Sequence, residues 1–305
     1  MKKVVLLLIC CFTACNTYAQ QPRYKFDIET INDTITLTKW RSKHEVVDMT
    51  QDERLRCIQK IGKSVFAENN DIVKVILPEG VLAIGSNAFA SCKQLIYVKL
   101  PNSIEYISHT AFAGCEELYL KSLPASLTHI GSMAFWVCRE LALSELPPNL
   151  KVIERNAFSG CRNMTLSKLP ESIEVLGNKV FSVCDNITVS TLPSGIEVLS
   201  EGLFVACKNI RKIIVPEGVT KIEYCAFGSC ENLVEVTLPS TLEIISSGAF
   251  AGSSNISIVN CYMDVPPKGF VPNFPDQTVI RVRSSLGDVY RANPAWSKYK
   301  IIDSL

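Results

Sequence analysis

Little in this chain of 305 residues favours nucleic-acid binding, membrane insertion or catalysis. The formal net charge is +1 and charged residues make up 20%, so no strong electrostatic field attracts a nucleic acid. After residue 20 no apolar run is long enough to span a bilayer. Histidine occurs only at His44, His109 and His129, and HExxH, GxSxG and glycine-rich phosphate-loop motifs are missing. We therefore expect a non-enzymatic protein without a metal or cofactor.

The N-terminal 19 residues have the pattern of a secretory signal peptide. Two lysines follow the initial methionine, an apolar run extends from Val4 to Phe12, and a short exit segment ends at Ala19. Cleavage after Ala19 makes Gln20 the first residue of the mature chain. We therefore exclude residues 1–19 from the fold prediction.

The same segment also fits a second processing route. Phe12-Thr13-Ala14-Cys15 resembles a bacterial lipobox, in which Cys15 is acylated and anchors the chain to membrane lipid, although Phe12 stands where leucine is usual. Either route exports the protein. Cleavage at Ala19 predicts a secreted or periplasmic protein, and acylation of Cys15 predicts a lipid-anchored protein at the cell surface.

The rest of the chain is dominated by one repeat. Phenylalanine returns every 23 residues without interruption, at Phe66, Phe89, Phe112, Phe135, Phe158, Phe181, Phe204, Phe227 and Phe250. A cysteine follows three residues later in seven copies, at Cys92, Cys115, Cys138, Cys161, Cys184, Cys207 and Cys230. A proline follows twelve residues after each of the first eight phenylalanines. A fixed period of this length predicts stacked turns in a solenoid.

Each repeat is expected to contain a strand, a corner and a short helical turn. The segment before the proline is strand-like, as in Ile72–Leu77, and the proline ends the pairing because it donates no hydrogen bond. A tight turn such as Gly131–Ala134 leads into one helical turn that ends near the cysteine. We predict about nine repeats over residues 58–261, with an N-terminal cap at 20–57 and a C-terminal cap at 262–305. In the C-terminal cap, Val279–Val282 is expected to form an antiparallel or terminal strand.

Four middle copies depart from this pattern. Their second apolar residue comes eight residues after phenylalanine, at Leu120, Leu143, Leu166 and Val189, whereas the outer copies place it at nine, as in Val75 and Val98. A shift of one residue reverses the facing of a strand, so we expect a β-bulge to absorb it. The middle copies are either a structural variant or a specialised binding stretch.

The 13 cysteines raise the question of disulfides, which exported proteins often contain. Equivalent positions of stacked turns lie about 5 Å apart, which just permits neighbouring cysteines to pair. Free cysteine is also among the most buried residue types and fills tight corners well. We expect the repeated cysteines to be buried free thiols.

The repeat resembles the unit of the BspA-like (Treponema pallidum type) leucine-rich repeat family, which reads roughly LxxIxLPxSLxxIgxxAFxxC. Leu95–Ile107, continued by Ala111-Phe112 and Cys115, matches that unit, as does Leu233–Leu242 with Ala249-Phe250. The resemblance implies a leucine-rich repeat solenoid of the α/β class and a bacterial surface or secreted protein, with a role in adhesion for some members. The family shares no binding motif, so no ligand residue is carried over.

Solenoids bind partners through the outward side chains of an extended sheet. We call the surface formed by the segments before each proline the strand face. The candidate partner-binding residues on it are Tyr97, Lys99, Tyr119, Lys168, Arg211 and Lys212. This mildly basic surface with two tyrosines suits an acidic protein or glycan, although lysine and threonine also cover strand faces that bind nothing.

Together these features predict an exported, non-enzymatic binding protein that acts in adhesion or recognition of a protein or glycan. The alternative is a structural lipoprotein of the cell envelope without a specific ligand. Asp33-Thr34-Ile35 also fits a pattern for bacterial O-glycosylation at Thr34, but a strand in the N-terminal cap explains those three residues equally well.

Overall fold

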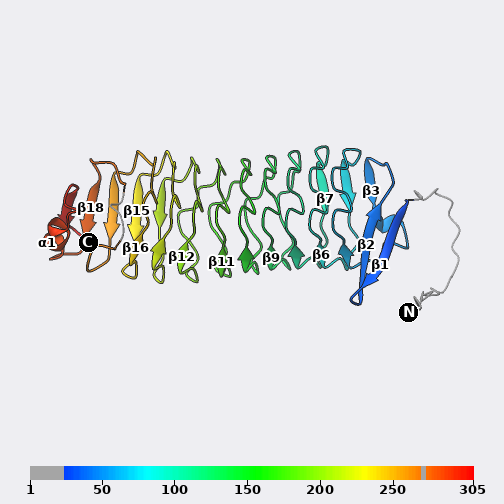
Figure 1. Cartoon of the computed structure of the whole chain (residues 1–305), viewed down its shortest axis with the longest axis horizontal. Helices are drawn as coiled ribbons and strands as arrows, with labels where there is room; N and C mark the ends of the chain where they lie inside the picture. The colour runs from blue at the N-terminus through cyan, green and yellow to red at the C-terminus, as the bar shows by residue number, and fades with distance from the viewer. Residues whose placement is uncertain (1–23, 269–272) are drawn as a thin grey trace.

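The protein is an elongated solenoid of about 11 turns. The structure, a computed structural model, describes residues 24–268 and 273–305. Figure 1 shows the turns stacked side by side, with a β-hairpin at the N-terminal end and a helix at the C-terminal end. The predicted leucine-rich repeat solenoid is confirmed.

Sheets on two faces line the stack, and their strands pair in parallel except for β1 (Phe26–Ile31) with β2 (Thr34–Trp40). On the strand face, β3 (Val46–Asp48), β5 (Lys74–Ile76) and β7 (Tyr97–Lys99) form one sheet. Further along the same face a five-stranded sheet contains β13 (Lys212–Ile214), β15 (Glu235–Leu238), β17 (Ile258–Cys261), β18 (Val279–Val282) and β19 (Lys300–Asp303).

The second sheet lies across the stack from the strand face and consists mainly of two-residue strands. Its eight-stranded part contains β1 (Phe26–Ile31), β2 (Thr34–Trp40), β4 (Lys60–Ile61), β6 (Ala83–Ile84), β8 (Tyr106–Ile107), β9 (His129–Ile130), β10 (Val152–Ile153) and β11 (Val175–Leu176). It resumes as β12 (Val198–Leu199), β14 (Lys221–Ile222) and β16 (Ile244–Ile245). The sequence-based prediction contains no second sheet, because a two-residue strand is too short for a recognisable alternation.

The predicted helical turn of each repeat forms as consecutive tight turns and does not extend into a helix. In the second repeat, the amide of Ala90 donates to the carbonyl oxygen of Asn87 and that of Cys92 to the carbonyl of Phe89, at 3.1 and 3.2 Å. Asn87 and Ser91 have φ values of 56° and 59°, a left-handed conformation that stops a right-handed helix. Within the described ranges, the helices are the 3₁₀ turn Met49–Gln51 and α1 (Gly287–Ala292).

The nine phenylalanines form one continuous buried stack along the axis of the solenoid. Every ring is at most 1% exposed. Neighbouring ring centroids lie 4.9–5.9 Å apart, with interplanar angles of 3–13°, which is an offset stack. Each of the first eight phenylalanine amides donates to a carbonyl of the next turn at 2.7–3.1 Å. Ring and backbone therefore hold the same register.

The seven repeated cysteines form a second buried column. Each Sγ donates to the phenylalanine carbonyl oxygen of the preceding turn, at 2.9–3.2 Å. All seven are free thiols, as predicted. In the last copy, Ser253 occupies this position and donates to Phe227 at 2.6 Å. Ser253 is only 1% exposed, so the core stays closed in this copy.

The strand-face sheet is interrupted in the four middle repeats. Between β7 and β13 the structure assigns no strand on this face, and the middle turns of Figure 1, drawn in green, carry arrows on one side only. The predicted bulge is therefore wrong. The outer copies place two outward residues directly after the first leucine, as in Leu95-Ile96-Tyr97-Val98, whereas the middle copies place them later, as in Leu120-Lys121-Ser122-Leu123. The two outward residues of the middle copies therefore occupy the positions at which the outer copies form hydrogen-bonded strands with neighbouring turns.

Both ends of the stack are capped by aromatic side chains. Trp40, in β2, lies 5.1 Å from Phe66, and Phe274 lies 5.0 Å from Phe250, each tilted against the terminal ring. In the C-terminal cap Tyr290, Trp296 and Tyr299 are buried, whereas Ile31 in the N-terminal cap is 46% exposed.

The C-terminal strand differs from the prediction in its pairing. Val279–Val282 is neither antiparallel nor terminal, since it pairs in parallel with β17 on one side and β19 on the other. The tail therefore continues the solenoid by two strands before the chain ends. Of these two strands, β18 follows the inward and outward alternation of the repeats, and both lack the phenylalanine frame.

Truncation of a central ring tests the stack. Phe158→Ala leaves a cavity between two parallel rings, so we expect it to lower the free energy of unfolding by roughly 3–5 kcal/mol, as measured by chemical denaturation. Trp136→Ala removes a large aromatic that is 45% exposed and serves as the control, with a much smaller loss. A Phe158→Ala variant as stable as the parent would contradict the stack.

The cysteine column predicts a loss of stability at alkaline pH. Burial raises the pKa of the Cys230 thiol from 9.0 to about 12 and that of Cys161 well above 9.0. Above pH 9 the unfolded chain therefore loses protons that the folded chain retains, so stability falls as pH rises. Cys161→Ala should make this decline shallower by up to about 1.4 kcal/mol per pH unit, as measured by denaturation under reducing conditions between pH 8 and 10. An unchanged slope would show that the thiol ionises freely in the folded protein.

Deletion of residues 262–305 tests the C-terminal cap. The deletion exposes the edge of β17 and the ring of Phe250, and an uncovered strand edge invites association. We expect an insoluble or self-associating product by analytical ultracentrifugation, with the full chain at the same concentration as the control. A monomeric truncation with an unchanged melting temperature would mean that the tail is an independent module.

Candidate ligand-binding groove on the strand face

The six predicted residues are all exposed on the strand face, and four of them line two hollows in the described part of the chain. Tyr97, Lys99 and Tyr119 line a hollow of about 410 Å³, and Lys168 lines a second hollow of about 560 Å³. Arg211 and Lys212 lie outside both, at the start of the five-stranded sheet.

The two hollows adjoin one another. Both are lined by Ser122, Leu123 and Ala125, so together they form one groove that extends from Tyr97 to Thr191. We call this the middle-repeat groove. It coincides with the stretch in which the strand-face sheet is interrupted.

The loss of pairing leaves backbone groups free in the groove. The amides of residues 121–123, 144–146 and 167–169 donate no hydrogen bond to any residue in the described ranges. A single contact per turn remains, as where Thr165 N donates to Leu143 O at 2.9 Å. Leu123, Leu146 and Leu169, with the prolines that follow them, line the same groove between these polar groups. Its surface therefore combines apolar side chains with segments whose backbone amides donate no hydrogen bond within the described residues.

Strand-face cations are mostly unpaired. Among the residues that the structure describes, no acidic partner lies within 4.0 Å of Lys74, Lys99, Lys121, Lys168 or Arg211. On this face Lys212 is the exception, because its Nζ lies 3.1 Å from Glu235 Oε1.

Two of the unpaired lysines lie over tyrosine rings. The Nζ atoms of Lys74 and Lys121 stand 5.7 and 5.9 Å from the ring centroids of Tyr97 and Tyr119. The rings thus hold the ammonium groups at the surface without neutralising them. Lys121 is missing from the sequence-predicted set, although the one-residue shift of the middle repeats is the signal that turns it outward.

Two carboxylates complete the groove. Glu171 Oε2 accepts hydrogen bonds from the amide and hydroxyl of Ser194 at 3.1 and 3.2 Å. Glu145 also lines the groove, and within the described residues it takes part in no ion pair. The groove therefore presents acceptors as well as cations.

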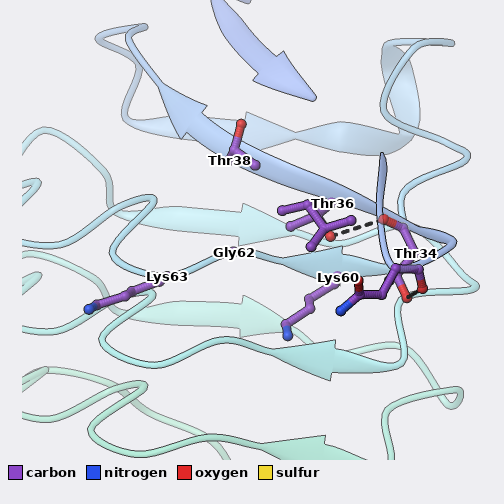
Figure 2. Close-up of a pocket in the computed structure, with 8 residues that line it drawn as sticks. Thr34, Thr36, Thr38, Lys60, Gly62 and Lys63 are labelled. Atoms are coloured by element: carbon purple, nitrogen blue, oxygen red, sulfur yellow. Dashed lines mark hydrogen bonds between the residues drawn. The ribbon is translucent and has the colours of Figure 1, made fainter. Parts of the chain in front are cut away.

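A second concavity of about 440 Å³ lies between the N-terminal hairpin and the first repeat. Figure 2 shows Thr34, Thr36 and Thr38 along β2, with Lys60 and Lys63 from the neighbouring turn. Thr34, the predicted glycosylation site, is half-buried here and donates to the carbonyl of Asn32 at 3.4 Å. Its modification stays a prediction.

The histidines do not converge on one site. His129 Nε2 lies 2.8 Å from Glu154 Oε1, and the ring stacks on Tyr106 at 4.3 Å, on the second sheet. His44 contacts Tyr24 in the N-terminal cap. In residues 24–268 and 273–305 there is no group of three or more potential ligands that could hold a metal ion, and no helix there has the length and apolarity to cross a membrane.

Comparison with known proteins identifies the family whose repeats match this sequence. The sequence matches the BspA type leucine rich repeat region in six copies, over residues 59–188 and 128–257. No curated protein matches it significantly.

Several solved bacterial structures are similar. The Treponema pallidum leucine rich repeat protein is 25% identical with a TM-score of 0.48, over 72% of this chain and 91% of that one. A leucine rich cell surface protein from Faecalibacterium prausnitzii is 20% identical with a TM-score of 0.41, over 81% and 95%. The pneumococcal vaccine antigen PcpA is 17% identical with a TM-score of 0.53, over 94% and 98%, and it shares the fold.

The matched ranges overlap and together cover more than half of the residues, including the repeated phenylalanine and cysteine columns from Phe66 to Phe250. The chain therefore belongs to the BspA-type leucine-rich repeat family.

Proposed function

We propose that this protein is an exported, non-enzymatic binding protein that recognises a protein or glycan through its strand face. The observation that carries the proposal is the row of exposed, unpaired cations along that face, from Lys74 to Arg211. An acidic partner that docks along the row supplies their missing counter-charges.

The likeness to bacterial leucine-rich repeat proteins supports the same role. The structure that shares the fold is described as a vaccine antigen, which supports a protein that acts at a cell surface. The N-terminal segment that predicts export, with its alternative processing sites at Ala19 and Cys15, lies outside the described residues.

A structural role at the cell envelope is the second candidate, and the sequence around Cys15 favours it. Acylation of Cys15 would tether the solenoid to lipid, and the strand face would then need no ligand. The mass of the mature N-terminus distinguishes the routes, since a chain that begins at Gln20 carries no lipid and a chain that begins at Cys15 carries one.

An array of glycans and extracellular matrix proteins tests the binding function. Lys74→Glu/Lys99→Glu/Arg211→Glu reverses three strand-face charges, and we expect it to abolish binding of any ligand that the parent retains. Lys93→Glu/Arg155→Glu/Lys208→Glu makes the same change of net charge at exposed sites away from this face and should leave binding intact. Equal loss in both variants, or no ligand for the parent, would contradict recognition by the strand face.

A further inference from the structure

The geometry points to the middle-repeat groove as the binding site of an unbranched acidic polysaccharide, which bears carboxylate or sulfate groups and lies along the axis of the solenoid. This inference rests on the proposed binding function of the strand face and names the class of its partner. It begins from the groove itself, where two adjoining hollows of about 410 and 560 Å³ share Ser122, Leu123 and Ala125.

The cations of the groove require an acidic ligand. Lys99 and Lys121 line its first hollow and Lys168 its second, and none of them has an acidic partner among the described residues. They project from three different turns, so a small anion contacts at most part of the set. A polymer with repeated negative charges reaches all of them.

The spacing of the turns favours a sugar chain. Equivalent positions of successive turns lie about 4.8 Å apart, which is close to the length of one sugar residue along an extended polysaccharide. An extended peptide advances only about 3.3–3.6 Å per residue, so its side chains fall out of step with the turns. A strand of peptide that follows the solenoid axis also runs across the repeat segments, where it cannot form a regular ladder with them.

The uncharged part of the groove suits sugar hydroxyls. The rings of Tyr97 and Tyr119, which are 40% and 41% exposed, stand in successive turns. One face of each carries a lysine Nζ, and the exposed part of the ring offers apolar contact to a sugar ring. The free amides of residues 121–123, 144–146 and 167–169 are donors for carboxylate or sulfate oxygens.

Glu145 favours a glycan over an acidic peptide as the ligand of the groove. Its carboxylate lines the second hollow, two turns from Lys99 and one turn from Lys168, where it repels a purely acidic chain. A sugar chain carries hydroxyl groups between its charges, and these donate hydrogen bonds to Glu145 and to free carbonyls of the groove. An acidic peptide has no such donors on its side chains.

Calorimetric titration with four polymers of matched length tests the assignment in the full mature chain. The acidic glycans are polygalacturonate and chondroitin sulfate, which distinguish carboxylate from sulfate recognition. The comparison polymers are neutral dextran and poly-L-glutamate. We expect at least one acidic glycan to bind, more weakly as salt rises, and both comparison polymers to bind at least about tenfold more weakly.

Pairs of substitutions test whether the glycan binds in the middle-repeat groove. Lys99→Gln/Lys168→Gln and Tyr97→Ala/Tyr119→Ala should each weaken the glycan by roughly tenfold or more. Lys93→Gln/Lys208→Gln removes the same charge outside the groove and should change affinity by less than about twofold. Glu145→Gln should tighten poly-L-glutamate more than the glycan. Circular dichroism of each variant confirms that the fold is retained.

The outcomes separate this inference from the broader function. Binding of neither acidic glycan, equal binding of poly-L-glutamate, or loss of affinity in the Lys93/Lys208 variant equal to that in the groove variants would overturn the assignment. If the matrix-protein array still gives a ligand that depends on the strand face, the proposed binding function survives. If both experiments are negative, both proposals fail.

Discussion

Everything in this molecule depends on the requirement that each 23-residue turn keep its phenylalanine ring in register with the rings above and below. Rings 4.9–5.9 Å apart and nearly parallel occupy the axis, and the backbone amide of each phenylalanine binds the next turn. The cysteine Sγ binds back to the previous turn through the phenylalanine carbonyl. The amide and the carbonyl of each phenylalanine are thus both tied to the following turn. An insertion of a single residue would break both columns, which explains why the period shows no slip over nine copies.

Because the ring stack and these hydrogen bonds already hold the turns together, the strand face can lose the hydrogen bonds between its own strands. In the middle turns the phenylalanine stack and the thiol column continue without interruption, and the second sheet pairs β9, β10 and β11 before it breaks between β11 and β12. The turns therefore stay stacked when strand-face hydrogen bonds are lost. The stretch that loses pairing gains a groove with free amides, outward lysines and apolar walls. The one-residue shift in the middle repeats, at Leu120, Leu143, Leu166 and Val189, therefore changes the surface without changing the core. The repeats that carry the shift are also those that form the proposed ligand-binding groove.

Much of this fold could be predicted from the sequence, because the strongest signals are periodic. The phenylalanine and cysteine columns, the strands before the outer prolines and the aromatic caps all follow from spacing and burial rules. The second sheet could not be predicted, because two-residue strands such as Val152–Ile153 are too short to show an alternation of apolar and polar residues. The shifted middle copies were visible in the sequence, but whether a shift produces a bulge or a gap depends on pairing between turns. For the same reason Tyr97, Lys99, Tyr119 and Lys168 could be selected as outward residues, whereas the groove that gathers them, and Lys121 within it, required the structure.

The central claim is that the strand-face sheet is broken in the middle repeats while the core beneath it is continuous. Hydrogen exchange of backbone amides, followed by mass spectrometry, tests this directly within single turns. The account predicts rapid exchange at residues 121–123, 144–146 and 167–169, against slow exchange at Gly131, Glu154 and Gly177, whose amides bind across the second sheet, and at the strands β7 and β15. Slow exchange along the whole strand face would mean that the sheet is continuous, and the groove with its free amides would not exist.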